Sequence, residues 1–120
     1  MTRRDVYSDV CPSRVLLDLL ANKWSALVIG LLERGPARFS ALQSRMEGVS
    51  PKMLTQTLRS LERDGLITRT ATPTVPVTVD YALTDLGVSL HQTTRQLRAW
   101  AQDHMDDVQA HRVEHDEGAV

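Results

Sequence analysis

The chain of 120 residues has a single cysteine, few aromatic residues and no long apolar run. Cys11 has no second cysteine to pair with, so the fold cannot contain an intramolecular disulfide and does not rely on oxidation. The longest apolar run, residues 26–32, is too short to cross a bilayer, and residues 1–10 are too polar for a signal peptide. We therefore expect a soluble protein of the cytoplasm.

The sequence also lacks the parts of an active site. It has no glycine-rich phosphate loop and no nucleophile elbow, and its histidines begin at His91, which leaves Cys11 without a predictable histidine partner. His111 and His115 have the i, i+4 spacing of zinc ligands, but they lie in an acidic terminal stretch where a solvated helix surface is more common. We expect no enzyme, no metal site and no cofactor.

Charge is unevenly distributed along a chain whose length suits one globular domain with a modest core. The formal net charge is −1, yet residues 34–69 contain seven cations and three anions, whereas residues 101–120 contain one cation and six anions. The distribution of charge decides which partner a surface attracts. The middle of the chain is therefore predicted to face an anion, and residues 106–120 to form an acidic, frayed tail.

The most informative segment is residues 50–65, which reads as a helix with both ends encoded. Ser50 is a favoured N-cap, Pro51 fits the first helical position, and Gly65 ends the helix. Leucines at helical spacing predict one buried stripe, and the remaining surface carries amide, hydroxyl and cationic groups. The buried stripe is Leu54, Leu58 and Leu61, and the exposed set is Lys52, Thr55, Gln56, Arg59 and Arg63. Such a face suits a DNA major groove, so we interpret the segment as a recognition helix.

Each exposed residue has an expected role. Thr55 suits a thymine methyl group or a phosphate, Gln56 suits adenine, and Arg59 suits guanine or a phosphate. Ser50 and Lys52, at the helix N-terminus, are expected to position a phosphate. Met53 either reaches the groove or packs against a neighbouring element, and packing is the more common outcome for a thioether.

The remaining elements follow in a compact order. Apolar spacing predicts a first helix around Val15 and Leu19, a second over residues 24–32, and a third from a Ser40 cap through Met46. Residues 66–70 and 77–83 read as two strands joined by a turn at 73–76. A long helix starts at residues 84–85 and fades after Met105. The order predicts a mainly α-helical fold with a small β-hairpin, namely a helix-turn-helix followed by a wing.

The order and spacing of these motifs resemble the HxlR-type family of winged-helix transcriptional regulators. The resemblance covers nearly all of residues 11–100, and it rests on the segments Cys11-Pro12, Lys23-Trp24, residues 35–39, residues 49–55, residues 61–66 and residues 81–87. It implies a homodimeric bacterial regulator, related in architecture to MarR-like proteins, that binds operator DNA through residues 50–64 and the wing. In some members the cysteine of the Cys-Pro pair senses oxidants or electrophiles.

The wing departs from the family pattern. Members often carry a basic residue just after the second wing proline, whereas this chain continues Pro76-Val77-Thr78. Arg69, on the preceding strand, is a candidate for a phosphate contact, although a strand arginine is about as often simply solvated. Arg38 is a further candidate DNA contact from the basic middle of the chain. The sequence leaves two roles for the wing, contact with the minor groove and bracing of the hairpin.

The sequence around Cys11 fits two interpretations, a reactive thiolate and an inert packed thiol. A position just outside a helix N-terminus, near Arg14, favours a reactive thiolate and therefore a redox sensor. Cysteine is also among the residues most often buried, so an inert packed thiol fits the same sequence.

Leftover apolar surface predicts a homodimer. The N- and C-terminal helices carry more apolar residues than a small winged-helix core can cover, and a partner subunit would cover them. The expected interface residues are Val15, Leu19, Leu86, Leu90, Leu97 and Trp100. We thus predict an arm over residues 1–10, a winged helix-turn-helix domain over 11–105 and a tail over 106–120, acting as a dimeric repressor. The alternatives are a module that binds another protein and a regulator controlled by a non-covalent small-molecule ligand.

Overall fold

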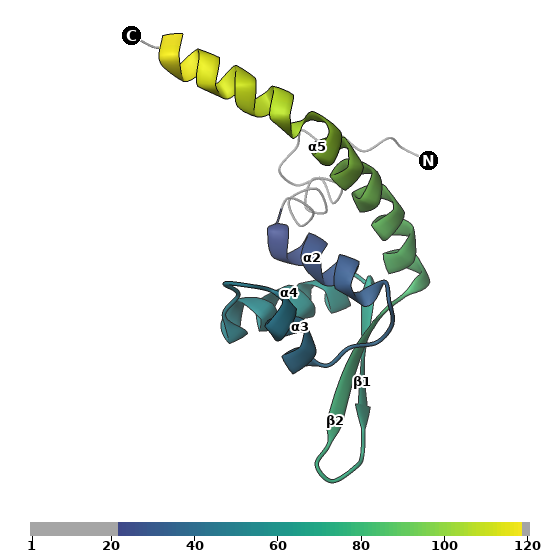
Figure 1. The fold of residues 1–120 in the computed structure, drawn as a ribbon. Coiled ribbons are helices and arrows are strands. Elements are labelled where there is room, and N and C mark those ends of the chain that lie inside the picture. Colours follow the sequence, from purple (N-terminus) through teal and green to yellow (C-terminus); the bar gives the residue numbers. More distant parts are fainter. Residues whose placement is uncertain (1–21, 119–120) are drawn as a thin grey trace.

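A computed structural model describes residues 22–118, which form four helices and one antiparallel hairpin (Figure 1). The elements are α2 (Lys23–Leu32), α3 (Phe39–Arg45), α4 (Pro51–Arg63), β1 (Ile67–Thr72), β2 (Thr78–Leu83) and α5 (Asp85–Gly118). The fold is the winged helix-turn-helix that the sequence predicts. The predicted first helix, with Cys11, Val15 and Leu19, lies outside the described residues.

The core lies where α2, α3 and α4 meet the base of the hairpin. Leu54, Leu58 and Leu61 of α4 are buried against apolar residues of the neighbouring elements, so the predicted stripe is confirmed. Their partners in the buried cluster are Val28, Ile29, Leu32, Leu42, Met46, Val49, Leu66 and Ile67. This packing orients α4, because only its leucine face is buried while the opposite face stays in solvent.

The hairpin continues directly from the end of α4. Gly65, with a φ of 75°, ends the helix in a left-handed conformation that glycine adopts without strain. The strands pair in register from Ile67 opposite Leu83 to Thr72 opposite Thr78. Ala37 joins the outer edge of β2 as an isolated bridge, in which the Ala37 and Tyr81 amides donate to each other's carbonyl oxygens at 2.9 and 2.8 Å. The wing is therefore attached to the chain segment just before α3.

The start of α3 differs from the sequence prediction. Ser40 was expected to cap this helix, but the helix begins at Phe39, and Arg38 is the N-cap residue without a side-chain capping bond. The bridge at Ala37 explains the difference, because it holds the backbone extended until Arg38 and the chain turns into a helix immediately afterwards. Ser40 is therefore an exposed residue of the first turn.

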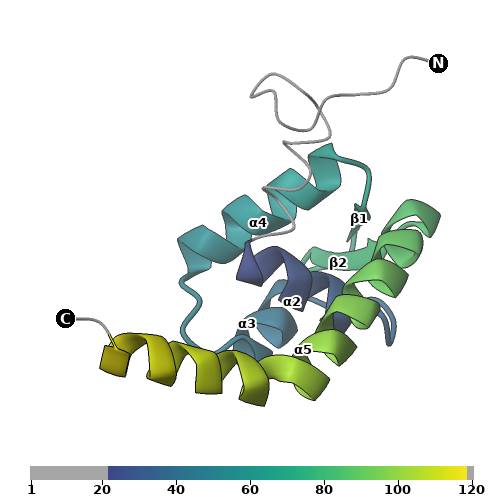
Figure 2. The ribbon, with the colours of Figure 1, turned by 90° about the horizontal axis from the view of Figure 1, so that it is seen from above.

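The end of α5 also differs from the prediction. Helical order was expected to fade after Met105 into a frayed tail, yet α5 continues to Gly118 and projects from the other helices as a long arm (Figures 1 and 2). Few residues of this arm are buried, and they lie near its start at Gly87 and His91. Leu90 packs partly against the core of its own chain, which reduces its availability for a partner subunit. No helix among residues 22–118 is both long and apolar enough to span a membrane.

Candidate nucleic-acid interface

The first turn of α4 is fixed by its cap. Ser50 is extended, and its Oγ accepts a hydrogen bond from the Met53 amide at 3.1 Å. Pro51 occupies the first turn, as predicted. The cap satisfies one of the free amides at the helix N-terminus, and the other amides of this turn face outward with the positive end of the helix dipole. This end of α4 can therefore receive an anion.

The outer face of α4 carries the side chains that the sequence assigns to DNA. Lys52, Gln56, Arg59 and Arg63 are exposed, and Thr55 is half-buried. Met53 was expected to pack more often than not, but it is 37% exposed. An exposed thioether beside Lys52 and Gln56 belongs to the outer surface of the helix.

Thr55 has a narrower role than the sequence alone suggests. Its Oγ1 donates to the Pro51 carbonyl oxygen at 2.7 Å. The hydroxyl proton is engaged in this bond, so a phosphate would have to displace it to gain a donor. The arrangement favours contact of Thr55 with an apolar group, such as a thymine methyl, over donation to a phosphate.

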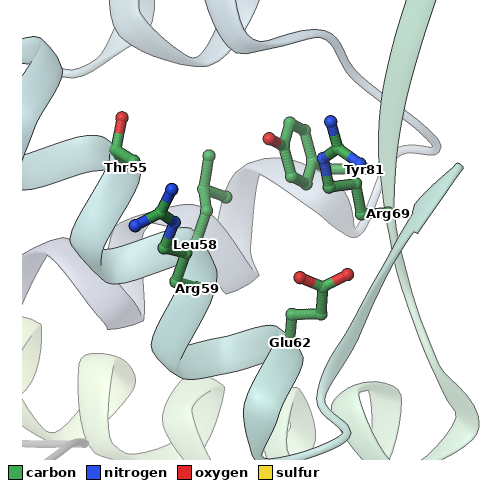
Figure 3. A pocket seen from close by; sticks show the side chains of 6 residues that line it. All are labelled: Thr55, Leu58, Arg59, Glu62, Arg69 and Tyr81. Carbon is green, nitrogen blue, oxygen red and sulfur yellow. The ribbon is translucent and has the colours of Figure 1, made fainter. Parts of the chain in front are cut away.

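A hollow of about 410 Å³ lies between α4 and the hairpin (Figure 3). Four of its lining residues come from one face of α4, and two come from the strands. The residues are Thr55, Leu58, Arg59, Glu62, Arg69 and Tyr81. Arg69 and Tyr81 are register partners, so they lie side by side on the hairpin face that is turned to α4. The structure therefore brings the predicted residues Arg59 and Arg69 to one site on two different elements.

Arg38 lies on the other side of the hairpin. Its Nε is 3.8 Å from Oδ1 of Asp80, and both side chains are well exposed. Asp80 precedes Tyr81, and successive strand residues point to opposite faces, so this ion pair is directed away from the hollow. A surface pair of this kind contributes little stability. Arg38 is thus available near the N-terminus of α3, but it does not join the Arg59 and Arg69 site.

The tip of the wing is uncharged. Residues 71–79 contain no charged side chain, and Val75 is fully exposed while Val77 is 63% exposed. Arg69 is the one cation on either strand. The positive charge that the hairpin offers to a phosphate is consequently confined to its base, beside α4.

Tyr81 and Glu62 line the hollow but were not among the predicted site residues. The signal for Tyr81 was available, because two predicted strands with a tight turn place it opposite Arg69 once the register is known. Glu62 was not singled out, since an exposed acid near a helix C-terminus has no distinctive pattern. Its carboxylate lines the hollow without an ion-pair partner among residues 22–118.

The acidic C-terminal helix shows no metal-binding arrangement. Within residues 22–118, no group of three or more histidine, cysteine, aspartate or glutamate side chains is placed to hold an ion. His104 stacks on Trp100 with ring centroids 4.6 Å apart, and the Nδ1 of His104 lies 2.9 Å from the Trp100 carbonyl oxygen.

Comparison with known proteins agrees with this geometry. The model of the HxlR-like helix-turn-helix family matches residues 19–109. The HTH-type transcriptional regulator YtfH of Escherichia coli K12 is 38% identical over 92% of this chain and 87% of its own length. The structure of the transcriptional regulator ytfH from Salmonella typhimurium is 37% identical, covers 92% of this chain and 98% of its own, and superposes with a TM-score of 0.83.

A third relative is the transcriptional regulator YodB of Bacillus subtilis. Its reduced form is 34% identical, with a TM-score of 0.68 over 77% of this chain and 91% of its own, and a diamide-treated form is also known. The extent of the family match and the sequence identity to these relatives establish the family of this chain. The chain belongs to the HxlR-like helix-turn-helix family of transcriptional regulators, which are DNA-binding proteins and not enzymes.

Proposed function

We propose that this protein is a dimeric repressor that binds a specific operator through α4. One observation carries the proposal. The helix is capped and buried on its leucine face, and its opposite face presents amide and guanidinium groups beside a hairpin that adds a further arginine. A rigid helix with such a face fits a major groove, in which each base pair offers a distinct pattern of donors and acceptors.

The exposed residues divide into those that read bases and those that hold phosphates. Gln56 is suited to adenine and Thr55 to a thymine methyl group, and Met53 adds apolar contact surface. Ser50 and Lys52 at the capped N-terminus are suited to a phosphate. Arg63 and Arg38 extend the cationic surface along the backbone. Arg59 is able to serve either purpose, and its position across the hollow from Arg69 favours a phosphate.

A second subunit is supported by the apolar surface of α5. Leu86, Leu97 and Trp100 share one face of α5 and are 58%, 68% and 51% exposed, so the helix presents an apolar stripe to solvent. Burial against a symmetry-related α5 would remove this surface from water, together with Val15 and Leu19. Two copies of α4 would then enter successive major grooves about 34 Å apart.

A redox signal is supported by the comparison with YodB, whose reduced and diamide-treated forms are known. Cys11 is the only thiol of this chain, so any thiol chemistry must take place there, within one subunit or between two. We include oxidation of Cys11 in the proposed function as the signal that changes operator affinity. The steric act of occupying a promoter is sufficient for repression.

The test is a selection of bound duplexes from a random DNA library, followed by binding measurements with Gln56→Ala. Selection should yield a two-fold-related sequence, and Gln56→Ala should lower discrimination at one base pair of each half-site by about 1–3 kcal/mol. Recovery of unrelated sequences would refute specific DNA binding and would favour a protein-binding role.

A further inference from the structure

The contact between the base of α5 and the end of α2 is unusual because it places a buried histidine beside a carboxylate. The side chain of His91 is 4% exposed, and its Nε2 lies 3.0 Å from Oε2 of Glu33, the C-cap residue of α2. The two atoms are close but not aligned as a hydrogen bond, and Nδ1 of the ring has no hydrogen-bond partner within residues 22–118. An apolar residue would fill such a position without leaving a buried nitrogen unpaired.

Two arginines of α5 lie on the same side of the helix as His91. Arg95 Nη1 is 4.0 Å from the second carboxylate oxygen of Glu33. Arg98 approaches α2 over Gly30, where an added methyl group would come within 3.0 Å of its Nη2. Residues 91, 95 and 98 have the i, i+4, i+7 spacing of one helix face. An acid at the C-terminal end of a helix is disfavoured by the dipole, so Glu33 gains from the nearby Arg95 guanidinium.

A second contact fixes α5 to the rest of the fold, at the start of the helix and before His91. The Thr84 amide donates to the Leu66 carbonyl oxygen at 3.1 Å, and Thr84 Oγ1 donates to the Gly65 carbonyl oxygen at 2.6 Å. Gly87 packs so closely that a Cβ built on it would overlap the Leu66 carbonyl oxygen. This contact ties the start of α5 to the end of α4. Two fixed points on one helix, at residues 84–87 and at His91, define the direction in which it leaves.

The direction of α5 matters because the helix is a long lever. From His91 to Gly118 it rises about 40 Å, and Figure 1 shows its C-terminal half extending away from α2, α3 and α4. If the subunits pair through α5, a change of angle at the joint moves each α4 relative to the other. The separation of the two recognition helices decides which half-site spacing the dimer accepts.

We propose that the contact between His91 and Glu33 sets the half-site spacing of the operator. The inference rests on the proposed function, because it requires a dimer that binds DNA. His91 and Glu33 are positioning residues here, since neither lies on the outer face of α4. Burial of the His91 ring beside the Glu33 carboxylate holds α5 in one orientation against α2, whereas an apolar pair would let the helix settle at several angles.

The test uses the duplex selected by the wild-type protein and variants of it in which the spacer is one or two base pairs shorter or longer. We compare the wild type with His91→Leu and Glu33→Gln, and use His111→Leu on an exposed part of α5 as the matched control. Sedimentation and thermal unfolding confirm that each protein is a folded dimer. Glu33 is half-exposed, so its replacement by glutamine keeps the test valid if His91→Leu fails to fold.

The wild type and His111→Leu should prefer one spacing by at least tenfold. In Glu33→Gln and His91→Leu this preference should fall at least threefold, while affinity for an isolated half-site stays unchanged. A merely structural role would lower the unfolding temperature and leave the spacing preference intact, and that result in Glu33→Gln would overturn the inference. If the wild type itself selects no duplex, the proposed function fails first and the inference falls with it.

Discussion

Arg69 of β1 and Tyr81 of β2 face each other across the hairpin and line one hollow with Arg59 of α4. The backbone of Tyr81 is fixed on its other side by two hydrogen bonds to Ala37. The hairpin therefore holds Arg69 at a defined position beside the recognition helix. This pairing explains how a hairpin with an uncharged tip still places a cation beside α4.

Removal of either arginine of the hollow should weaken DNA binding uniformly across sequences. Each neutralised phosphate releases counterions, so a plot of log affinity against log salt has a negative slope. Arg59→Ala and Arg69→Ala should each make this slope less steep by about 0.9. The slopes come from titrations at several salt concentrations. Arg112→Ala, a cation on the exposed part of α5, is the control and should leave the slope unchanged. Equal slopes in all four proteins would exclude the hollow from the interface.

Loss of the cap should destabilise α4. Ser50→Ala removes the acceptor for the Met53 amide and should lower the free energy of unfolding by about 1 kcal/mol. Chemical denaturation measures this value. Ser60→Ala, at an exposed position of the same helix, should change stability far less. Equal effects of the two substitutions would show that the cap contributes nothing specific.

Gly87 should tolerate no side chain. In Gly87→Ala the new methyl group overlaps the Leu66 backbone carbonyl, which cannot move without disturbing the junction of α4 and β1. We expect a loss of about 1–3 kcal/mol in the free energy of unfolding. Gly118→Ala, where nothing lies within 4 Å, is the comparison and should be near neutral. A stable Gly87→Ala protein would contradict the close packing at this junction.

The exposed ring of Trp100 provides a test of dimerisation. Trp100→Ala should raise the dimer dissociation constant at least tenfold, or about 1.4 kcal/mol, because a large apolar side chain leaves the interface. Analytical ultracentrifugation over a range of concentrations measures the constant. Val75→Ala removes an even more exposed apolar side chain, from the wing tip, and should leave the dimer intact. An unchanged dimer in Trp100→Ala would place the interface elsewhere.

Diamide should lower operator affinity of the wild type and have no effect on Cys11→Ser. The substitution removes the only thiol while leaving α4 untouched, so basal binding should be preserved. Operator affinity is measured before diamide treatment, after it, and again after reduction with dithiothreitol. If Cys11→Ser still responds to diamide, the redox part of the proposed function is wrong.

The sequence predicted α4 well because its signals are local. A serine cap, a first-turn proline, a leucine stripe and a terminal glycine all act within a few residues, and each is found in the structure. The cap of α3 was mispredicted because a distant residue decides it. Tyr81 pairs with Ala37, and the helix begins at Phe39, directly after this bridge, an interaction that no local pattern encodes.

Long-range contacts also explain why the hollow between α4 and the hairpin could not be predicted from the sequence. The hollow exists because the hairpin register places Arg69 and Tyr81 beside α4, and a shift of one residue would have turned one of the two side chains away. The continuation of α5 to Gly118 was missed for another reason. Its end has no continuous apolar stripe, so apolar periodicity gave no signal for a helix there.

The most direct test of DNA recognition by α4 is fluorescence anisotropy of the wild-type protein with its selected duplex and with a scrambled duplex of equal composition. Both titrations are run at about 50 and 200 mM salt. We predict binding to the selected duplex that is at least a hundredfold tighter than to the scrambled one, and a steep loss of affinity at the higher salt. Equal affinity for the two duplexes, or binding indifferent to salt, would contradict the role of α4 as a recognition helix.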